Sequence, residues 1–236
     1  MAGRRRPSPH SHAADETRLR ISREAARLMA EEGVLDFHAA KRKAVERLNL
    51  PEGQHLPSNP EIEQALSEHL QLFHARDLPQ TLHRLRRLAL QAMRLLERFE
   101  PRLVGSLLSG NVTRFSEIEL HVTADAPELV AFFLREQAIP HEEASKRLRF
   151  GGDRSETLPV YRFLAEDARQ GRGSMEASRM PGDATAIEVT VFSPTAAREA
   201  PLSPADGRPM KRVPLKDVEA INTEFLLAPA LPKLKR

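Results

Sequence analysis

Residues 103–122, LVGSLLSGNVTRFSEIELHV, join two different patterns. Apolar residues run into Gly105-Ser106, the hydrophobic pattern is then lost for about ten residues, and a strict alternation follows that places Glu117 and Glu119 around Ile118. Side chains of an extended strand alternate between its two faces. We therefore predict a strand with its apolar side chains in a core and its two carboxylates on the opposite face, roughly 6.6 Å apart along the strand.

Two carboxylates that follow a small-residue turn are typical of a magnesium and triphosphate site. Magnesium is usually held by one or two carboxylates together with substrate phosphates. Glycine lets backbone N–H groups come close to a phosphate, and a short helix after the turn would direct its positive end at the anion. The pattern thus predicts that Glu117 and Glu119 bind metal and that Gly105 and Ser106 bind nucleotide.

The same residues carry a family resemblance. Gly105-Ser106 followed by Glu117-Ile118-Glu119 resembles the signature of the DNA polymerase β-like nucleotidyltransferase superfamily, with hydrophobic residues, Gly-Ser, a spacer and an acidic-hydrophobic-acidic strand. The resemblance covers residues 102–125 and extends more loosely to Phe192. One departure is chemical, because the superfamily favours aspartate at the metal positions and this chain has the longer glutamate at both.

The superfamily also has a third acidic residue on a later strand, and the resemblance assigns that position to Glu188. This residue interrupts an alternation in which Ile187, Val189 and Val191 share the other face. The resemblance implies that Glu188 is catalytic, either binding a second metal or helping to activate the nucleophile. The alternative interpretation is that Glu117, Glu119 and Glu188 lie on the solvent-exposed face of a half-exposed sheet, an arrangement that is common in antiparallel structure.

If the resemblance extends to function, it implies transfer of a nucleoside monophosphate from an NTP to an acceptor hydroxyl. Two Mg²⁺ ions, about 4 Å apart in such sites, would neutralise the charge. Gly105 and Ser106 would hold the β- and γ-phosphates, and Arg114 in the spacer would lie near the triphosphate. The acceptor stays open between a small molecule, RNA and protein, because acceptor choice lies outside the metal site.

Two other functions remain open. The first is a catalytically degenerate nucleotidyltransferase fold that acts as a nucleotide-sensing or protein-interaction module. The second is a nucleic-acid-binding protein, because the helix expected from Pro79 has a basic face that could bind phosphates. The alternative is that this face is simply solvated. Its basic residues are Arg84, Arg86, Arg87 and Arg94. The segment AARLMAEEGV also resembles the first helix of TetR-type regulators, but Pro51-Glu52-Gly53 replaces their recognition helix.

Composition sets wide limits. The 236 residues are 40% hydrophobic and 29% charged, which is enough for one or two domains with a real core. A net charge of +3 permits an acidic partner without requiring one. The absence of cysteine excludes disulfides, thiolate zinc sites and cysteine nucleophiles. No apolar run reaches the length of a membrane span, so we expect a cytoplasmic protein without membrane partners.

The predicted fold is α+β, with an N-terminal helical subdomain followed by a nucleotidyltransferase-like mixed sheet flanked by helices. We expect a disordered basic tail over 1–16, the helical subdomain over 17–97, the nucleotidyltransferase-like domain over 98–227 and a basic tail over 228–236. The helical periodicity predicts helices over 17–33, 37–48, 59–75 and from 79, with Asn59 as the N-cap of the third. Alternation predicts further strands over 141–150, 158–164 and 185–192.

His121 lies two residues after Glu119 and should share the acidic face. We expect it either to face a nucleotide or, more ordinarily, to be partly exposed and paired with a carboxylate.

Overall fold

The computed structural model describes residues 9–51, 55–166 and 184–220, and it confirms the predicted α+β class. The chain divides into two compact units. We call them the helical unit (1–81, 111–116 and 203–208) and the sheet unit (82–110, 117–202 and 209–236). This division falls after Thr81, whereas the sequence placed the boundary at 97. The tail predicted over 228–236, and residues 1–8 of the other predicted tail, lie outside the described residues.

The helical unit is built on helices α1 (Pro9–Glu32), α2 (Phe37–Arg47) and α3 (Asn59–Phe73). α1 begins at Pro9, eight residues before the predicted start at Thr17. Apolar residues at three- and four-residue steps form one buried core from all three helices, and their centre is fully buried at Ile21, Ala25, Ala44 and Ile62. The predicted amphipathic helices therefore pack on each other, as their stripes require.

The start of α3 differs in detail from the prediction. Ser58 is the N-cap: its hydroxyl accepts from the backbone N–H of Glu61, and the Glu61 carboxylate accepts from the backbone N–H of Ser58 at 2.7 Å. Asn59, predicted as the cap, is the first helical residue, and its side-chain amide donates to the carbonyl of Pro204 at 2.6 Å. The reciprocal capping box satisfies two helix-end groups at once.

Ser58→Ala should lower the free energy of unfolding by about 0.5–2 kcal/mol, because the first turn of α3 loses its cap. Thermal unfolding followed by circular dichroism measures the change. Ser67→Ala, in the middle of the same helix, is the matched control and should be neutral or slightly stabilising. Equal losses in both variants would contradict the assignment of Ser58 as the cap.

The sheet unit is built on a six-stranded mixed sheet with the order β3-β4-β5-β2-β1-β6. β2 and β5 are parallel, and the other neighbours are antiparallel. The strands are β1 (Arg102–Val104), β2 (Ile118–Thr123), β3 (Glu142–Arg149), β4 (Ser155–Glu166), β5 (Ala184–Phe192) and β6 (Val213–Pro214). The predicted strands over 141–150, 158–164 and 185–192 are confirmed with small shifts at their ends.

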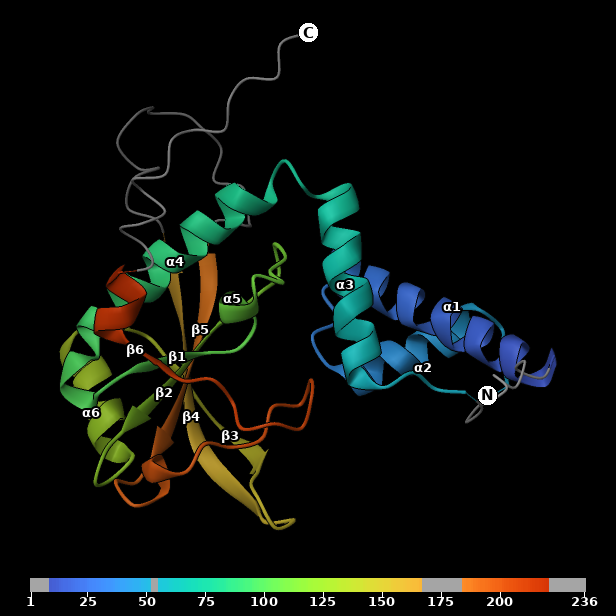
Figure 1. The fold of residues 1–236 in the computed structure, drawn as a ribbon. Helices are drawn as coiled ribbons and strands as arrows, with labels where there is room; N and C mark the ends of the chain where they lie inside the picture. Colours follow the sequence, from blue (N-terminus) through green and yellow to red (C-terminus); the bar gives the residue numbers. More distant parts are fainter. Residues whose placement is uncertain (1–8, 52–54, 167–183, 221–236) are drawn as a thin grey trace, which may run out of the picture. The chain divides into compact units, whose positions relative to one another are not determined.

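Helices α4 (Leu78–Leu95) and α6 (Glu128–Glu136) cover one face of this sheet (Figure 1). Ile118, Leu120, Ile187 and Val189 point to that face and are fully buried. Arg84 of α4 donates to the hydroxyl of Thr185 at 2.8 Å, on the same face. The remaining short elements are α5 (Ser106–Ser109), η1 (Glu97–Phe99) and η2 (Ala196–Arg198). The helices thus cover the apolar face and leave the face that carries the glutamates for other contacts.

No helix among the described residues is both long enough and apolar enough to cross a membrane.

Candidate functional site

The strand register brings two of the predicted glutamates together. Glu119 of β2 is the direct parallel partner of Glu188 of β5, and Glu188 is in turn opposite Arg162 of β4. Paired residues of neighbouring strands point to the same face. The sheet therefore places both carboxylates and one guanidinium in a single row, on the face turned away from α4 and α6.

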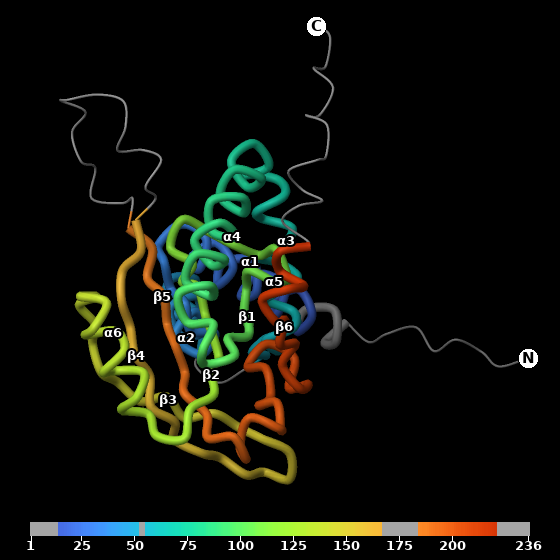
Figure 2. The backbone as a smooth tube through the Cα atoms, turned by 90° about the vertical axis from the view of Figure 1, so that its left-hand side faces the viewer, coloured from blue at the N-terminus to red at the C-terminus, as the bar shows by residue number. Residues whose placement is uncertain are grey.

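A lysine from the edge strand joins the two carboxylates. The Lys146 Nζ of β3 donates to Glu188 Oε1 at 2.6 Å and to Glu119 Oε2 at 3.0 Å. In a flat sheet, three strand spacings would separate β3 from β2 by about 14 Å, beyond the reach of a lysine. The β3–β4 hairpin curves strongly (Figure 2), which lets Lys146 cross the two intervening strands. We call Glu119, Glu188, Lys146 and Arg162 the ion-pair cluster.

Glu188 is the most buried member of the ion-pair cluster, at 3% exposure. Burial by itself would raise the pKa of its carboxyl, but Lys146 and then Arg162 outweigh this effect and hold the pKa below its usual value. Arg162 contributes two hydrogen bonds to Glu188 Oε2, from Nε at 3.0 Å and from Nη2 at 2.5 Å. Glu188 therefore stays ionised, with both oxygens paired, at neutral pH.

Glu117 is not part of the ion-pair cluster. It is half-buried, and it makes no hydrogen bond or ion pair with any other residue in the described part of the chain. Burial raises the pKa of its carboxyl, and the negative charges of Glu188 and Glu119 raise it further against the opposing effect of Arg162 and Lys146. Glu117 thus interacts electrostatically with the ion-pair cluster but forms no ion pair with Lys146 or Arg162.

Gly105 lies directly against Glu119. A Cβ built at this position would come 2.3 Å from Glu119 Oε1, and the backbone has φ 78° and ψ −159°, a region that only glycine populates freely. The predicted Gly-Ser turn is therefore placed beside the carboxylate. Ser106 opens α5, a single turn in which its carbonyl accepts from the N–H of Gly110 at 3.0 Å.

Gly105→Ala should destabilise the protein by about 2–4 kcal/mol, because it combines a strained backbone with an overlap on Glu119. Gly110→Ala is the matched control: it also has a positive φ, of 81°, but a Cβ there would meet nothing within 4 Å. We expect a cost of about 1–2 kcal/mol for the control. Chemical denaturation measures both, and equal costs would contradict the close approach at Gly105.

Glu117→Gln and Glu188→Gln should shift stability in opposite directions. The raised pKa of Glu117 makes its ionised form a liability in the folded state, so Glu117→Gln should be more stable than wild type at neutral pH. That gain should shrink as the pH falls through the folded pKa and vanish below the usual value of 4.5.

The lowered pKa of Glu188 has the reverse sign. Its ionised form stabilises the fold above the usual 4.5, so Glu188→Gln should be less stable at neutral pH, with the loss shrinking as the pH falls through the lower folded pKa. Denaturant unfolding measured between about pH 3 and about pH 8 tests both predictions, because this range extends from below to well above the usual pKa values of carboxyl groups. Losses of the same sign in both variants would contradict the electrostatic description.

The donor atoms do not fit a two-metal site as they stand. Among the described residues, no three His, Asp or Glu side chains gather in a way that could hold a metal ion. Glu119 and Glu188 approach each other, but the Lys146 ammonium occupies the position between them where a shared cation would bind. Their negative charge is already matched by Lys146 and Arg162.

Arg114, predicted to lie near a triphosphate, has its contacts within the helical unit. Its Nη2 donates to the carbonyl of Glu31 at 3.2 Å, and its guanidinium lies 4.6 Å from the centre of the Phe115 ring. Residues 111–116 belong to that unit, whereas Gly105 and the glutamates belong to the sheet unit.

His121 is not paired with any carboxylate in the part of the chain that the structure describes, and it is buried, so the more ordinary of our two expectations is wrong. It is 3% exposed, and its ring centre lies 4.6 Å from that of Phe192. Burial, together with the positive charges of Arg212 and Lys146, lowers the pKa of His121 to about 3. The imidazole is therefore neutral at physiological pH and packs against Phe192 on the same face of the sheet as Glu119.

The basic face of α4 is partly used inside the protein. Arg84 bonds Thr185, and Arg94 pairs with Glu219 at 2.8 Å. Burial lowers the pKa of Arg86, and Arg87 is half-buried. This face is therefore neither fully solvated nor an open wall of cations, which weakens the nucleic-acid-binding hypothesis.

Lys146 and Arg162 were missed by the sequence reasoning. A signal for Arg162 was present, because it interrupts the apolar sequence Val160-Tyr161 and Phe163 of a predicted strand. Lys146 lies in the charged segment 141–150, where no pattern distinguishes it from its neighbours.

Comparison of the chain with protein-family models, with curated proteins and with solved structures gives no match. We therefore infer the function from the residues and geometry of the site.

Proposed function

We propose that the sheet unit is a nucleotidyltransferase-like domain that has lost metal-dependent transfer and acts as a binding module. The observation that carries this proposal is the Lys146 ammonium, which donates to both Glu119 and Glu188, at 3.0 and 2.6 Å. A protein cation takes the place that the resemblance assigns to magnesium. The proposal also includes the cytoplasmic location that the sequence predicts.

Charge balance supports this function. Two carboxylates and two cations cancel in the ion-pair cluster, so an incoming Mg²⁺ would have to displace Lys146 and leave its ammonium in a partly buried site. Magnesium also gives up its water shell reluctantly. Buried Glu188 needs a permanent partner, because an unpaired charge in the interior is strongly destabilising. The cluster is consistent with a structural role in which the carboxylates hold the curved hairpin.

The second candidate is Mg²⁺-dependent transfer of a nucleoside monophosphate from an NTP to an acceptor hydroxyl. One observation favours it: Gly105 has a backbone conformation that only glycine populates freely, and this places the Gly-Ser turn directly against the Glu119 carboxylate. Glu117, with its raised pKa and no partner among the described residues, is the kind of group that a cation would stabilise. This function requires Lys146 to leave the carboxylates.

Magnesium should distinguish the two. We expect millimolar Mg²⁺ to leave the unfolding midpoint of the wild-type protein unchanged, and we expect no Mg²⁺-dependent release of pyrophosphate from any NTP. Lys146→Met should lower the stability by about 1–3 kcal/mol, because Glu188 loses one of its two cations and Lys146 is partly exposed. Mg²⁺ should then restore part of this loss, since a ligand that binds only the folded state stabilises it.

Arg147→Met is the matched control, because it removes the same charge from the adjacent, exposed position of β3. It should respond to Mg²⁺ no more than the wild type does. Pyrophosphate release by the wild-type protein that Glu119→Gln abolishes would refute the proposal and establish the transferase.

A further inference from the structure

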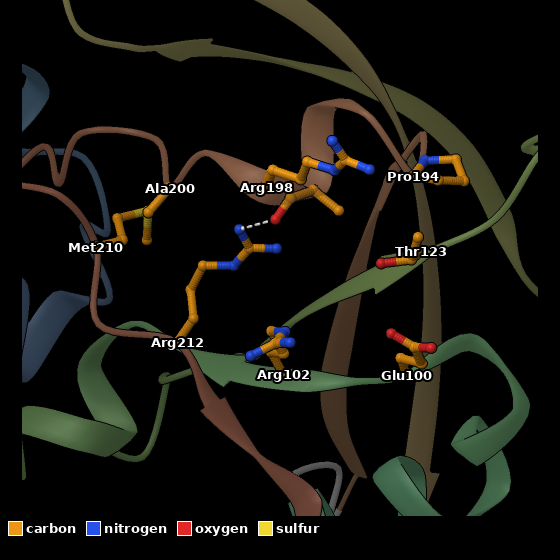
Figure 3. Close-up of a pocket in the computed structure, with 9 residues that line it drawn as sticks. Glu100, Arg102, Thr123, Pro194, Arg198, Ala200, Met210 and Arg212 are labelled. Carbon is orange, nitrogen blue, oxygen red and sulfur yellow. Dashed lines mark hydrogen bonds between the residues drawn. The ribbon is translucent and has the colours of Figure 1, made fainter.

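A cavity of about 670 Å³ lies in the sheet unit, beyond the ends of β2 and β5. Three arginines from separate parts of the chain line it: Arg102 of β1, Arg198 of η2 and Arg212, just before β6. Figure 3 shows the Arg212 side chain extending toward the turn that carries Arg198, with Arg102 on the strand beside it. Thr123 contributes a hydroxyl to the same lining.

The positive charge of this cavity is not balanced by the protein. Among the described residues, neither the Arg102 nor the Arg198 guanidinium takes part in a hydrogen bond or ion pair, and Glu100 is the one acidic residue of the lining. Glu199, next to Arg198 in the chain, is paired with Arg154 instead. The guanidinium groups therefore face the cavity with an excess of positive charge.

Arg212 is fixed in place but incompletely paired. Its Nη1 donates to the carbonyls of Ala197 and Glu199 at 2.9 and 3.2 Å, and its guanidinium lies 5.1 Å from the centre of the Phe192 ring. Its Nε is buried and has no partner among the described residues. Burial and the like charge of Arg102 lower the pKa of its guanidinium. A buried donor without an acceptor is costly.

We propose that this cavity binds the phosphate group of a small phosphomonoester through Arg102, Arg198 and Arg212. Guanidinium groups present paired N–H donors that match phosphate oxygens, and such charge-assisted bonds are strong. A phosphate alone would fill only part of the cavity, whose volume lies within the range of about 300–1,000 Å³ typical of sites for small organic ligands. The apolar surface of Met210 and Ala200 on the far side of Arg212 can receive the remainder of the ligand.

This site is separate from the ion-pair cluster. Thr123 follows Glu119 by four positions on β2, which corresponds to about 13 Å along the strand. Ligand binding in this cavity therefore does not require magnesium at the carboxylates.

Isothermal titration of the full chain with AMP, with inorganic phosphate and with adenosine tests the proposal, at matched ionic strength and without magnesium. We expect AMP and phosphate to bind and adenosine not to bind. Arg198→Gln and Arg102→Gln should each weaken AMP binding about tenfold or more, because each removes a charge-assisted hydrogen bond. Arg212→Lys, which keeps the charge but loses the planar fork, tests the third arginine without leaving a neutral side chain there.

Arg149→Gln is the control, since it removes an exposed arginine of the same unit that does not line the cavity. It should bind AMP as the wild type does. The proposal is overturned by the absence of AMP and phosphate binding at millimolar concentration, by equal weakening in Arg149→Gln, or by binding of single-stranded RNA without binding of AMP.

Discussion

The burial of Glu188 is the constraint on which the sheet unit depends. A carboxylate at 3% exposure in the middle of a mixed sheet cannot remain charged without partners, and an unpaired charge there would cost several kcal/mol. Arg162 on the adjacent strand supplies one partner, and Lys146 supplies the other from the edge strand. Because Lys146 must cross β4 to reach Glu188, and β5 as well to reach Glu119, the charge pairing and the curvature of the β3–β4 hairpin require each other. The same curvature brings the Lys146 ammonium within hydrogen-bonding distance of Glu119.

The period-2 pattern predicted much of this arrangement. Alternation around Glu119 and Glu188 placed both on one face of a sheet, and the structure pairs them directly on neighbouring parallel strands. The class of fold and most strands and helices followed from the same local periodicity, since a strand or helix that buries one face must show it in sequence. The N-cap of α3 is Ser58, one residue before the predicted Asn59. Both residue types favour the N-cap position, and only the side-chain geometry decides between them.

The cations could not be predicted in the same way. Lys146 is 27 residues from Glu119 and 42 from Glu188, and its contact with them depends on strand order and on sheet curvature, neither of which the local pattern contains. His121 shows the same limitation: alternation gave its face correctly, but the packing against Phe192 that buries it comes from another strand. The arginine cavity brings together residues 102, 198 and 212, which share no motif. Contacts between residues far apart in the sequence therefore decide the chemistry of both sites.

The most direct test of the central claim is a crystal structure grown in millimolar Mn²⁺, with the ion located by its anomalous scattering. The proposed replacement of metal by a protein cation predicts the Lys146 ammonium between Glu119 and Glu188, and no anomalous peak at that position. A manganese ion bound to both carboxylates, with Lys146 turned away from them, would contradict the account and restore the metal-dependent transferase.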